Sequence, residues 1–482
     1  MCRRNAYMTV TLALCLTLAL TFCLTLIEGV RQNACRMETE CVTDIALYSV
    51  QAEYHRQLME QYNLFAIDSS YGTDTYGEEN VVERLRYYLE QNLDYEDIFL
   101  SGVFYKDFLG LDVTGLDMTY VSCITDCDGA VFRDCAMEAV RSDVGLELFE
   151  QVRDWLQVIE VNGLESSDVA GQKAEMDEQL EAYSGTKVET EKNVWETIII
   201  DNPTESLEEK RKQGILKLVL VDEDVLSQVV LNAETLAGSR MRQGNIFVGD
   251  TVLEDNYQES LFEKFLFREY LLRYMGHYGA ESEKDVLKYQ AEYLVVGANS
   301  DVENLRKVAN RICVIREAAN ILYLLGSDVR REEVHLVAET ISTLTLLPWL
   351  APLLETIMIL GWSFAESVYD VKTLLEGGKI PLLKDDESWH YGLIPALVGD
   401  LRESGSEEEG MSYSDYLRVF LMLEKDDVLT ERAMNMVEAD IRNSTGNSNF
   451  RLDACFVAFK ADVTFESVFG YEYSVSGEKQ YK

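Results

Sequence analysis

The stretch AYMTVTLALCLTLALTFCLTLI fills residues 6–27, from Ala6 to Ile27, and decides how the rest of the chain is held. It contains no charged residue, and as an α-helix it would be about 33 Å long. The hydrocarbon core of a bilayer is roughly 30 Å thick, so the stretch predicts a single membrane-spanning helix. Arg3 and Arg4 precede it, which favours a cytoplasmic tip of residues 1–5 and an extracytoplasmic position for the bulk of the chain.

A cleaved signal peptide is the alternative interpretation of the same stretch. The apolar run is long for the core of a signal peptide, and no A-x-A cleavage site follows it. A lipoprotein signal is not indicated either, because the bulky Phe22 precedes Cys23 where a small residue is needed. We therefore expect a single-pass protein of the cell membrane.

The apolar pattern does not end with the membrane span. Apolar residues continue at spacings of three and four, which places them on one face of a helix, and no proline interrupts residues 6–65. We therefore expect the span to continue into a stalk helix over residues 28–66. Two alternatives are open for its apolar stripe: it packs against the protein's own globular part, or it packs against neighbouring subunits. In the second case the packing seam consists of Val30, Met37, Ile45 and Tyr48.

Composition excludes some classes of partner. The 482 residues include 43 Lys and Arg against 85 Asp and Glu, which gives a net charge of −42. A surface this acidic repels nucleic-acid phosphates and anionic lipid headgroups, so we predict no nucleic-acid partner. The hydrophobic content of 47% and the presence of only five prolines indicate a packed, helix-rich protein with more than one domain.

The remaining sequence predicts an α+β protein that is mostly helical. Residues 67–256 indicate an α/β region with a polar, Gly- and Ser-punctuated exposed insertion at 162–193. Residues 257–445 have the apolar spacing of a helical bundle, and residues 446–482 partly alternate apolar and polar side chains as strands do. Because the C-terminal strands cannot stand alone, we expect them to pair with strands near residues 111–124 in a small, mainly antiparallel sheet.

A second apolar stretch, at residues 341–365, is long enough to raise the question of a second span. Pro348, Pro352 and Glu355 interrupt it at mid-depth, and a charge there would be costly in hydrocarbon. A pair of core helices with a proline-containing break is the better interpretation.

Cysteines are the candidate residues for a disulfide or a zinc site. A disulfide between Cys123 and Cys127 can form if this segment lies outside the cell, although Cys135 makes a third cysteine in the cluster. Free, small, buried thiols are the simpler interpretation of the three cysteines. No histidine lies near these cysteines in sequence, so we predict no zinc site.

Glu366 and Asp370 lie four residues apart and so share one face of a predicted helix. Two carboxylates this close could serve in general acid–base catalysis if a cleft raised the pKa of one of them. In a chain with 85 acidic residues such pairs arise by chance, and a solvated or hydrogen-bonded helix face is the simpler interpretation. The sequence has no phosphate-binding loop, zinc-protease, nucleophile-elbow or EF-hand motif, so we predict no catalytic, cofactor-binding or metal-binding residue.

Short motifs near the N-terminus and in the second half of the chain resemble those of a known family. They include YMTVTL at residues 7–12, LIEGVR at 26–31, YQAEYL at 289–294 and the pattern Trp362-x-x-x-Glu366-x-x-x-Asp370. Together they resemble a bacterial family of unknown function, domain-of-unknown-function family 5702. The N-terminal part is similar to the TadE/TadG pseudopilins of tight-adherence pilus systems, but it has no Gly just before the span and no Glu five residues into it. The resemblance implies an envelope protein presented by one N-terminal helix and implies no known activity.

The function expected from these observations is not enzymatic. We expect a structural or accessory, minor-pilin-like component of a tight-adherence pilus or secretion apparatus, which contacts pilus or secretion proteins, or itself, through the stalk helix. One alternative is an exported hydrolase of cell-wall polymer that acts through Glu366, Asp370 or Glu292. Another is a surface adhesin or binding module that uses the 162–193 insertion.

Overall fold

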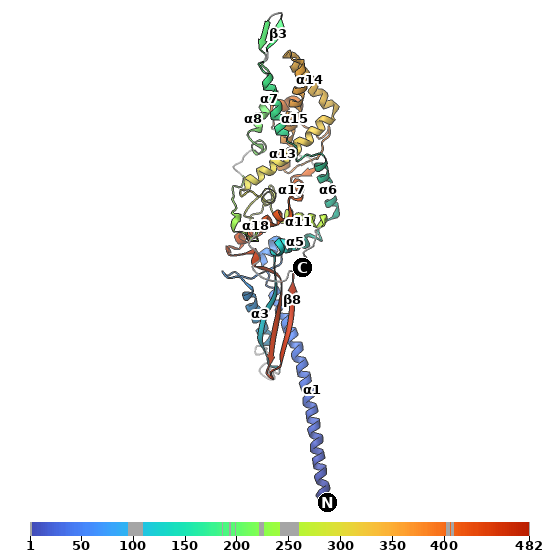
Figure 1. The fold of residues 1–482 in the computed structure, drawn as a ribbon, viewed down its shortest axis with the longest axis vertical. Coiled ribbons are helices and arrows are strands. Elements are labelled where there is room, and N and C mark those ends of the chain that lie inside the picture. The colour runs from blue at the N-terminus through green and yellow to red at the C-terminus, as the bar shows by residue number, and fades with distance from the viewer. Residues whose placement is uncertain are drawn as a thin grey trace. The chain divides into compact units, whose positions relative to one another are not determined.

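The computed structural model describes residues 2–94, 109–185, 187–191, 194–197, 199–220, 226–241, 260–401, 405 and 409–481. It confirms the predicted class, an α+β protein that is mostly helical (Figure 1). The chain divides into two compact units. The first, here called the sheet unit, comprises residues 1–135, 239–257 and 444–482, and the second, the helical unit, comprises residues 136–238 and 258–443.

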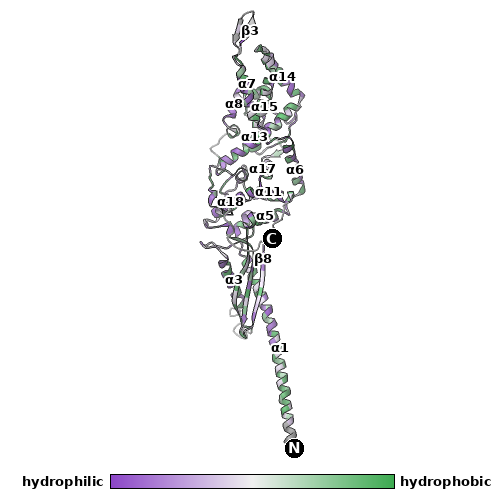
Figure 2. Cartoon of the chain, in the orientation of Figure 1, coloured by the Kyte–Doolittle hydropathy of each residue, from purple (hydrophilic) through white to green (hydrophobic). Residues whose placement is uncertain are grey.

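The sheet unit begins with α1 (Cys2–Gln51), a helix of 50 residues. Its N-terminal part is mainly hydrophobic (Figure 2), and the bulky apolar side chains from Tyr7 to Ile27 are exposed. From Arg31 onward one face of the same helix is buried against the sheet. The helix therefore has two parts with different surroundings, as expected for a span that continues into a stalk.

The stalk helix expected over residues 28–66 is shorter than predicted, because α1 ends at Gln51 and a separate helix, α2 (Arg56–Tyr62), follows. The His55 ring caps α2 by accepting a hydrogen bond from the Leu58 backbone N–H at 3.2 Å. Within the intervening turn, the Glu53 carboxylate pairs with Arg84 and accepts the hydroxyl of Tyr88 at 2.7 Å. These contacts fix the break without a proline or glycine, which is why apolar spacing alone did not reveal it.

The sheet joins early and late segments of the chain, as predicted. Its strands are β1 (Ile67–Asp68), β2 (Leu111–Cys123), β7 (Cys455–Ser467) and β8 (Glu472–Gln480). All pairings are antiparallel, with β2 along one side of β7 and with β1 and β8 both paired to β7. Leu116 faces Val463 in the β2–β7 register, and Val463 faces Val475 across to β8.

The core of the sheet unit lies between the sheet and two helices, α1 and α3 (Glu78–Leu93). Buried residues of α1 alternate in threes and fours, which gives the helix one inward face. The members of this core include Cys35, Val42, Ala46 and Leu47 of α1, Val81, Leu85 and Leu89 of α3, and Phe459, Val463 and Phe465 of β7.

The helical unit is organised around α15 (Ala351–Leu375), most of whose residues are buried. The longest helix packed against it is α13 (Asp301–Gly326), and α14 (Asp328–Leu344) and α7 (Val169–Tyr183) also contact it. The proline-containing break is where the sequence predicted it: α14 ends at Leu344, Pro348 opens the short helix η3 (Pro348–Leu350), and α15 starts at Ala351.

Shorter elements complete the fold, and α5, α10 and α18 each contain residues of both units. They are α5 (Asp126–Val140), α6 (Leu146–Val161), β3 (Lys187–Glu191), β4 (Val194–Thr197), α8 (Glu205–Arg211), α9 (Ile215–Val219), η2 (Ala233–Thr235), α10 (Ala237–Met241), α11 (Leu261–Tyr274), α12 (Gln290–Val296), β5 (Lys379–Ile380), α16 (Leu393–Val398), β6 (Met411–Ser412), α17 (Tyr413–Leu423), α18 (Asp426–Thr445) and η4 (Leu452–Ala454).

The segment 162–193 is not simply an exposed insertion. It contains α7, which buries Val169, Lys173 and Leu180. The Lys173 ammonium is buried because it pairs with the Asp177 carboxylate and lies 3.5 Å from a Glu208 carboxylate oxygen. The polar composition of the segment did not indicate this packing, since its buried polar residues are paired with each other.

Strand β8 packs closely against α1 at Gly477, and this packing can be tested. A Cβ atom added at Gly477 would overlap the Cδ1 atom of the buried Leu47. We expect Gly477→Val to destabilise the sheet unit by about 1–3 kcal/mol, measured by denaturation of the full-length protein in detergent micelles. Ser474→Val, at an exposed position on the same strand, is the control for strand propensity and should have little effect. Equal stability of the two variants would contradict the described packing.

Candidate functional site

The N-terminal part of α1 is long and apolar enough to span a membrane. Its most apolar window has a mean hydropathy of 2.4, and none of that window is buried inside the protein. The threonine hydroxyls of this part do not need water, because they donate to carbonyls of the preceding turn. Thr17 bonds Leu14 at 2.9 Å, Thr21 bonds Thr17 at 2.9 Å and Thr25 bonds Phe22 at 2.8 Å. The length, the composition and the hydrogen bonding of this part all suit hydrocarbon.

The predicted seam lies on the outer face of α1. Val30, Met37, Ile45 and Tyr48 are 69%, 64%, 49% and 56% exposed. The opposite face of the helix is the one that packs against the sheet. Tyr48 nevertheless contacts the sheet, because the Lys479 ammonium of β8 lies 3.3 Å from the centre of its ring. Packing of the stripe against neighbouring subunits stays a prediction.

The second apolar stretch is a core helix. The most apolar 18-residue window within Pro348–Leu375 has a mean hydropathy of 1.2, and 56% of that window is buried. It carries the predicted acidic pair, and both Glu366 and Asp370 are 0% exposed. Neither carboxylate is solvated, so the hydrogen-bonded alternative of the sequence interpretation describes them, in a buried form that the sequence did not reveal.

The acidic pair belongs to a buried cluster of four charges. The Lys384 ammonium bonds Glu366 and lies 2.6 Å from Asp370 Oδ1. The Arg316 Nε donates to Asp370 Oδ2 at 2.9 Å, and both Arg316 and the Lys384 side chain are also buried. The backbone N–H groups of His390 and Tyr391 donate to the two Glu366 oxygens at 3.0 and 2.9 Å.

The charges in this cluster balance, two negative against two positive. Burial alone would raise the pKa of Asp370, but the Arg316 guanidinium and the Lys384 ammonium outweigh it and hold this pKa below its usual range. The oxygens of both carboxylates lie against cations or backbone donors, and solvent does not reach them. This arrangement fixes helices α13 and α15 to the loop around Lys384, and it does not leave a carboxylate free for acid–base work.

The sequence indicated half of this cluster. The four-residue spacing identified Glu366 and Asp370 because it needs only helix periodicity. Arg316 lies 54 residues and Lys384 lies 14 residues from Asp370, and no local pattern links them. The sequence signal that could have identified Arg316 is its position on the apolar face of α13, after Ile312 and Ile315, where a cation needs a buried partner.

Glu292 is a buried carboxylate of a different kind. It is 0% exposed on α12 and accepts the Tyr413 hydroxyl at 2.6 Å and the Tyr278 N–H at 2.9 Å, both at Oε1. Its Oε2 has no hydrogen-bond partner among the described residues. Burial, only partly offset by these two hydrogen bonds, raises the pKa of Glu292 to about 7.

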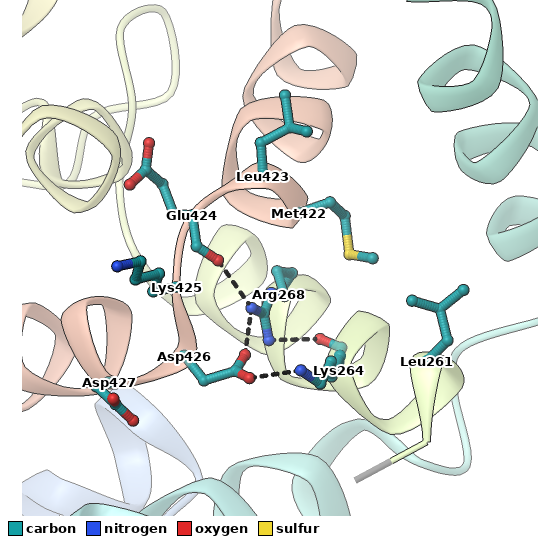
Figure 3. Close-up of a pocket in the computed structure, with 9 residues that line it drawn as sticks. All are labelled: Leu261, Lys264, Arg268, Met422, Leu423, Glu424, Lys425, Asp426 and Asp427. Carbon is teal, nitrogen blue, oxygen red and sulfur yellow. Dashed lines mark hydrogen bonds and ion pairs between the residues drawn. The ribbon is translucent and has the colours of Figure 1, made fainter. Parts of the chain in front are cut away.

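The hollow in Figure 3 has a volume of about 420 Å³ and lies between α11 and the junction of α17 with α18. Asp426 sits between its two main cations: it pairs with Arg268, and its Oδ2 is 2.7 Å from the Lys264 ammonium. Arg268 also donates to the Glu424 carbonyl at 3.2 Å. Lys264 and Arg268 are therefore already paired with Asp426, and the lining indicates no particular ligand class.

Cys123 lies buried at the end of β2, and no disulfide joins it to Cys127 in the part of the chain that the structure describes. Burial raises the pKa of the Cys123 thiol well above its usual value. The disulfide stays a prediction that depends on the redox state of the compartment.

Residues 193–467 match the protein family described as a family of unknown function, DUF5702. This match covers more than half of the chain. The chain belongs to this family. No curated protein and no solved structure matches the chain. Both the four-charge cluster and Glu292 lie inside the segment that matches DUF5702, whereas α1 lies outside it.

The four-charge cluster is expected to contribute to the free energy of unfolding of this DUF5702 protein. Glu366→Gln leaves excess positive charge buried with Lys384, and we expect it to lower the free energy of unfolding by about 3 kcal/mol. Glu376→Gln, at an exposed position next to the end of the same helix, is the matched control and should change stability by less than about 0.5 kcal/mol. Denaturation of full-length protein in micelles measures both. A Glu366→Gln protein as stable as the control would show that the cluster does not hold the helical unit together.

Glu292 makes a pH prediction. The Glu292 carboxyl group holds its proton more tightly in the folded protein than in the unfolded chain, where its pKa is near 4.5. The resulting stabilisation is present below pH 4.5 and is lost as pH rises through about 7. We expect Glu292→Gln to abolish this contribution, so that its stability relative to wild type rises between pH 5 and pH 8 by at most about 3 kcal/mol. Glu283→Gln, at an exposed position, controls for the loss of one negative charge, and a pH profile that matches this control would contradict the prediction.

Proposed function

We propose that this protein is a single-pass, extracytoplasmic envelope protein held by α1, and that it serves as a structural or accessory, minor-pilin-like component of a tight-adherence pilus or secretion apparatus. The observation that carries the proposal is the change in surroundings along one unbroken helix. The apolar part from residue 7 to residue 27 has no protein cover, and the part after Arg31 is packed against the sheet. A helix of this kind suits a protein that is presented from a membrane.

The exposed seam favours a protein that assembles with other subunits over one that acts as a monomer. Val30, Met37, Ile45 and Tyr48 follow directly from the span and form an exposed apolar stripe on the part of α1 that projects from the membrane. Anchored proteins share one plane and one orientation, so such stripes on neighbouring helices can meet without a further loss of rotational freedom. The resemblance to TadE/TadG pseudopilins supports the same role for the N-terminal helix.

The hydrolase alternative has less support. Two of its three carboxylates, Glu366 and Asp370, are buried and paired with cations, and Glu292 is fully buried. A polymer substrate needs exposed groups in a cleft. The described residues offer no observation that favours the adhesin alternative.

The seam provides the test of the proposal. We expect Met37→Asp and Ile45→Asp to abolish a high-mass complex that full-length protein forms in its native membrane, because each places a charge in an apolar helix contact. Blue native electrophoresis of membranes extracted with mild detergent measures this complex. Both side chains are exposed, so neither variant should change the fold.

Arg36→Gln is the matched control, because Arg36 is exposed on the same stretch of α1 but lies off the stripe, and the substitution also makes the charge more negative by one. It should leave the complex intact. A complex that survives both seam substitutions, or a wild-type protein that migrates alone, would contradict an assembly role through α1.

A further inference from the structure

The turn between β7 and β8 carries exposed apolar side chains close to the end of the uncharged part of α1. Val468 is 74% exposed, Phe469 is 65% exposed and Tyr471 is 43% exposed. Three exposed bulky residues within four positions at a hairpin tip are unusual on a surface that faces only water. The question is what covers them.

The position of the tip along α1 is fixed by contacts within the sheet unit. The Arg31 guanidinium lies 3.5 Å from the centre of the Phe469 ring. Further along, Gly477 approaches Leu47, and Lys479 bonds Asp44 at 2.7 Å. Strand β8 therefore runs beside α1 with its tip towards the membrane-spanning end of the helix (Figure 1).

The level of the tip follows from helix geometry. Arg31 is four residues beyond Ile27, which ends the uncharged span, and four residues of α-helix rise about 6 Å. The headgroup layer on each side of a bilayer is roughly 5–8 Å thick. If residues 6–27 cross the hydrocarbon core, Phe469 beside Arg31 lies at the depth of the headgroups.

The turn is built to hold its side chains at that depth. The Ser467 N–H donates to the Tyr471 carbonyl at 2.9 Å, and the Gly470 N–H donates to the Ser467 carbonyl at 2.8 Å. Gly470 has a φ of 74°, which a glycine adopts without strain. The Val468 N–H is held by the Gly110 carbonyl at 2.9 Å.

We infer that the β7–β8 turn is a second membrane contact, in which Val468, Phe469 and Tyr471 enter the interfacial layer of the bilayer that α1 spans. Aromatic side chains with a polar end or a neighbouring cation are favoured in this layer. The inference rests on the proposed membrane anchoring of α1. It gives the sheet a fixed height and tilt on the membrane, because the protein then has two points of attachment in place of one.

The charges near the turn select the kind of lipid. Glu466 and Glu472 face each other across the base of the hairpin, and both are exposed. Two carboxylates just above the headgroups disfavour an anionic surface. The surface that fits the turn is therefore a zwitterionic one, such as phosphatidylcholine.

Tryptophan fluorescence in vesicles tests the inference. Full-length protein is reconstituted in phosphatidylcholine vesicles with or without bromine on the acyl chains, since bromine quenches only tryptophans that reach the lipid. Three variants are compared: Leu16→Trp in the span, Phe469→Trp at the turn and Ser474→Trp higher on β8. The five native tryptophans are in the helical unit, and the wild-type signal is subtracted.

We expect bromine to quench Leu16→Trp strongly, to quench Phe469→Trp at least half as much, and to leave Ser474→Trp unchanged. Quenching of Leu16→Trp without quenching of Phe469→Trp would overturn the second contact and leave the anchor in place. Failure to quench Leu16→Trp would overturn the anchor and the inference with it. Emission of Phe469→Trp that changes with protein density and not with bromine would show that a second copy or another protein covers the turn, which also overturns the inference.

Discussion

The structure depends on α1 remaining one helix across a change of surroundings. In hydrocarbon every backbone polar group must be satisfied within the segment, and an unbroken helix with back-bonded threonines meets that requirement. Beyond Arg31 the same helix becomes one wall of the sheet unit's core. The sheet is therefore attached rigidly to the apolar part of α1, and its β7–β8 turn lies at a defined distance from the end of the uncharged segment.

The helical unit meets a different constraint, which is to bury carboxylates in a very acidic chain. It does so in two ways. Glu366 and Asp370 are neutralised by Lys384 and Arg316. Other carboxylates accept backbone N–H groups of irregular segments: Asp301, for example, accepts those of Lys288 and Tyr289 at 2.9 and 3.2 Å. In both cases the acids act as structural acceptors, which agrees with a role in scaffolding better than with one in catalysis.

The parts predictable from sequence are those set by local periodicity. The long apolar N-terminal helix, the break at Pro348 and the four-residue spacing of Glu366 and Asp370 follow from patterns within a few helical turns. The pairing of early and late strands followed from their strand periodicity together with the need of the C-terminal strands for a partner. The end of α1 at Gln51 does not, because it is fixed by contacts of Glu53 with Arg84 and Tyr88, more than 30 residues away. Arg316 and Lys384 escaped prediction for the same reason, since the fold and not the chain brings them to Asp370. The exposure of the seam could not be predicted either, because periodicity identifies an apolar face of a helix but does not show whether another part of the protein covers it.

Whether α1 holds the protein permanently in a membrane is decided by the intact mass and cell fraction of the mature protein. Envelope membranes, sheared surface material and medium would be compared by mass spectrometry. We expect full-length protein in the membrane fraction, resistant to extraction with carbonate. A shorter product that begins after Ile27 and is free in the medium would contradict it, because that protein would have lost its anchor as a cleaved signal peptide.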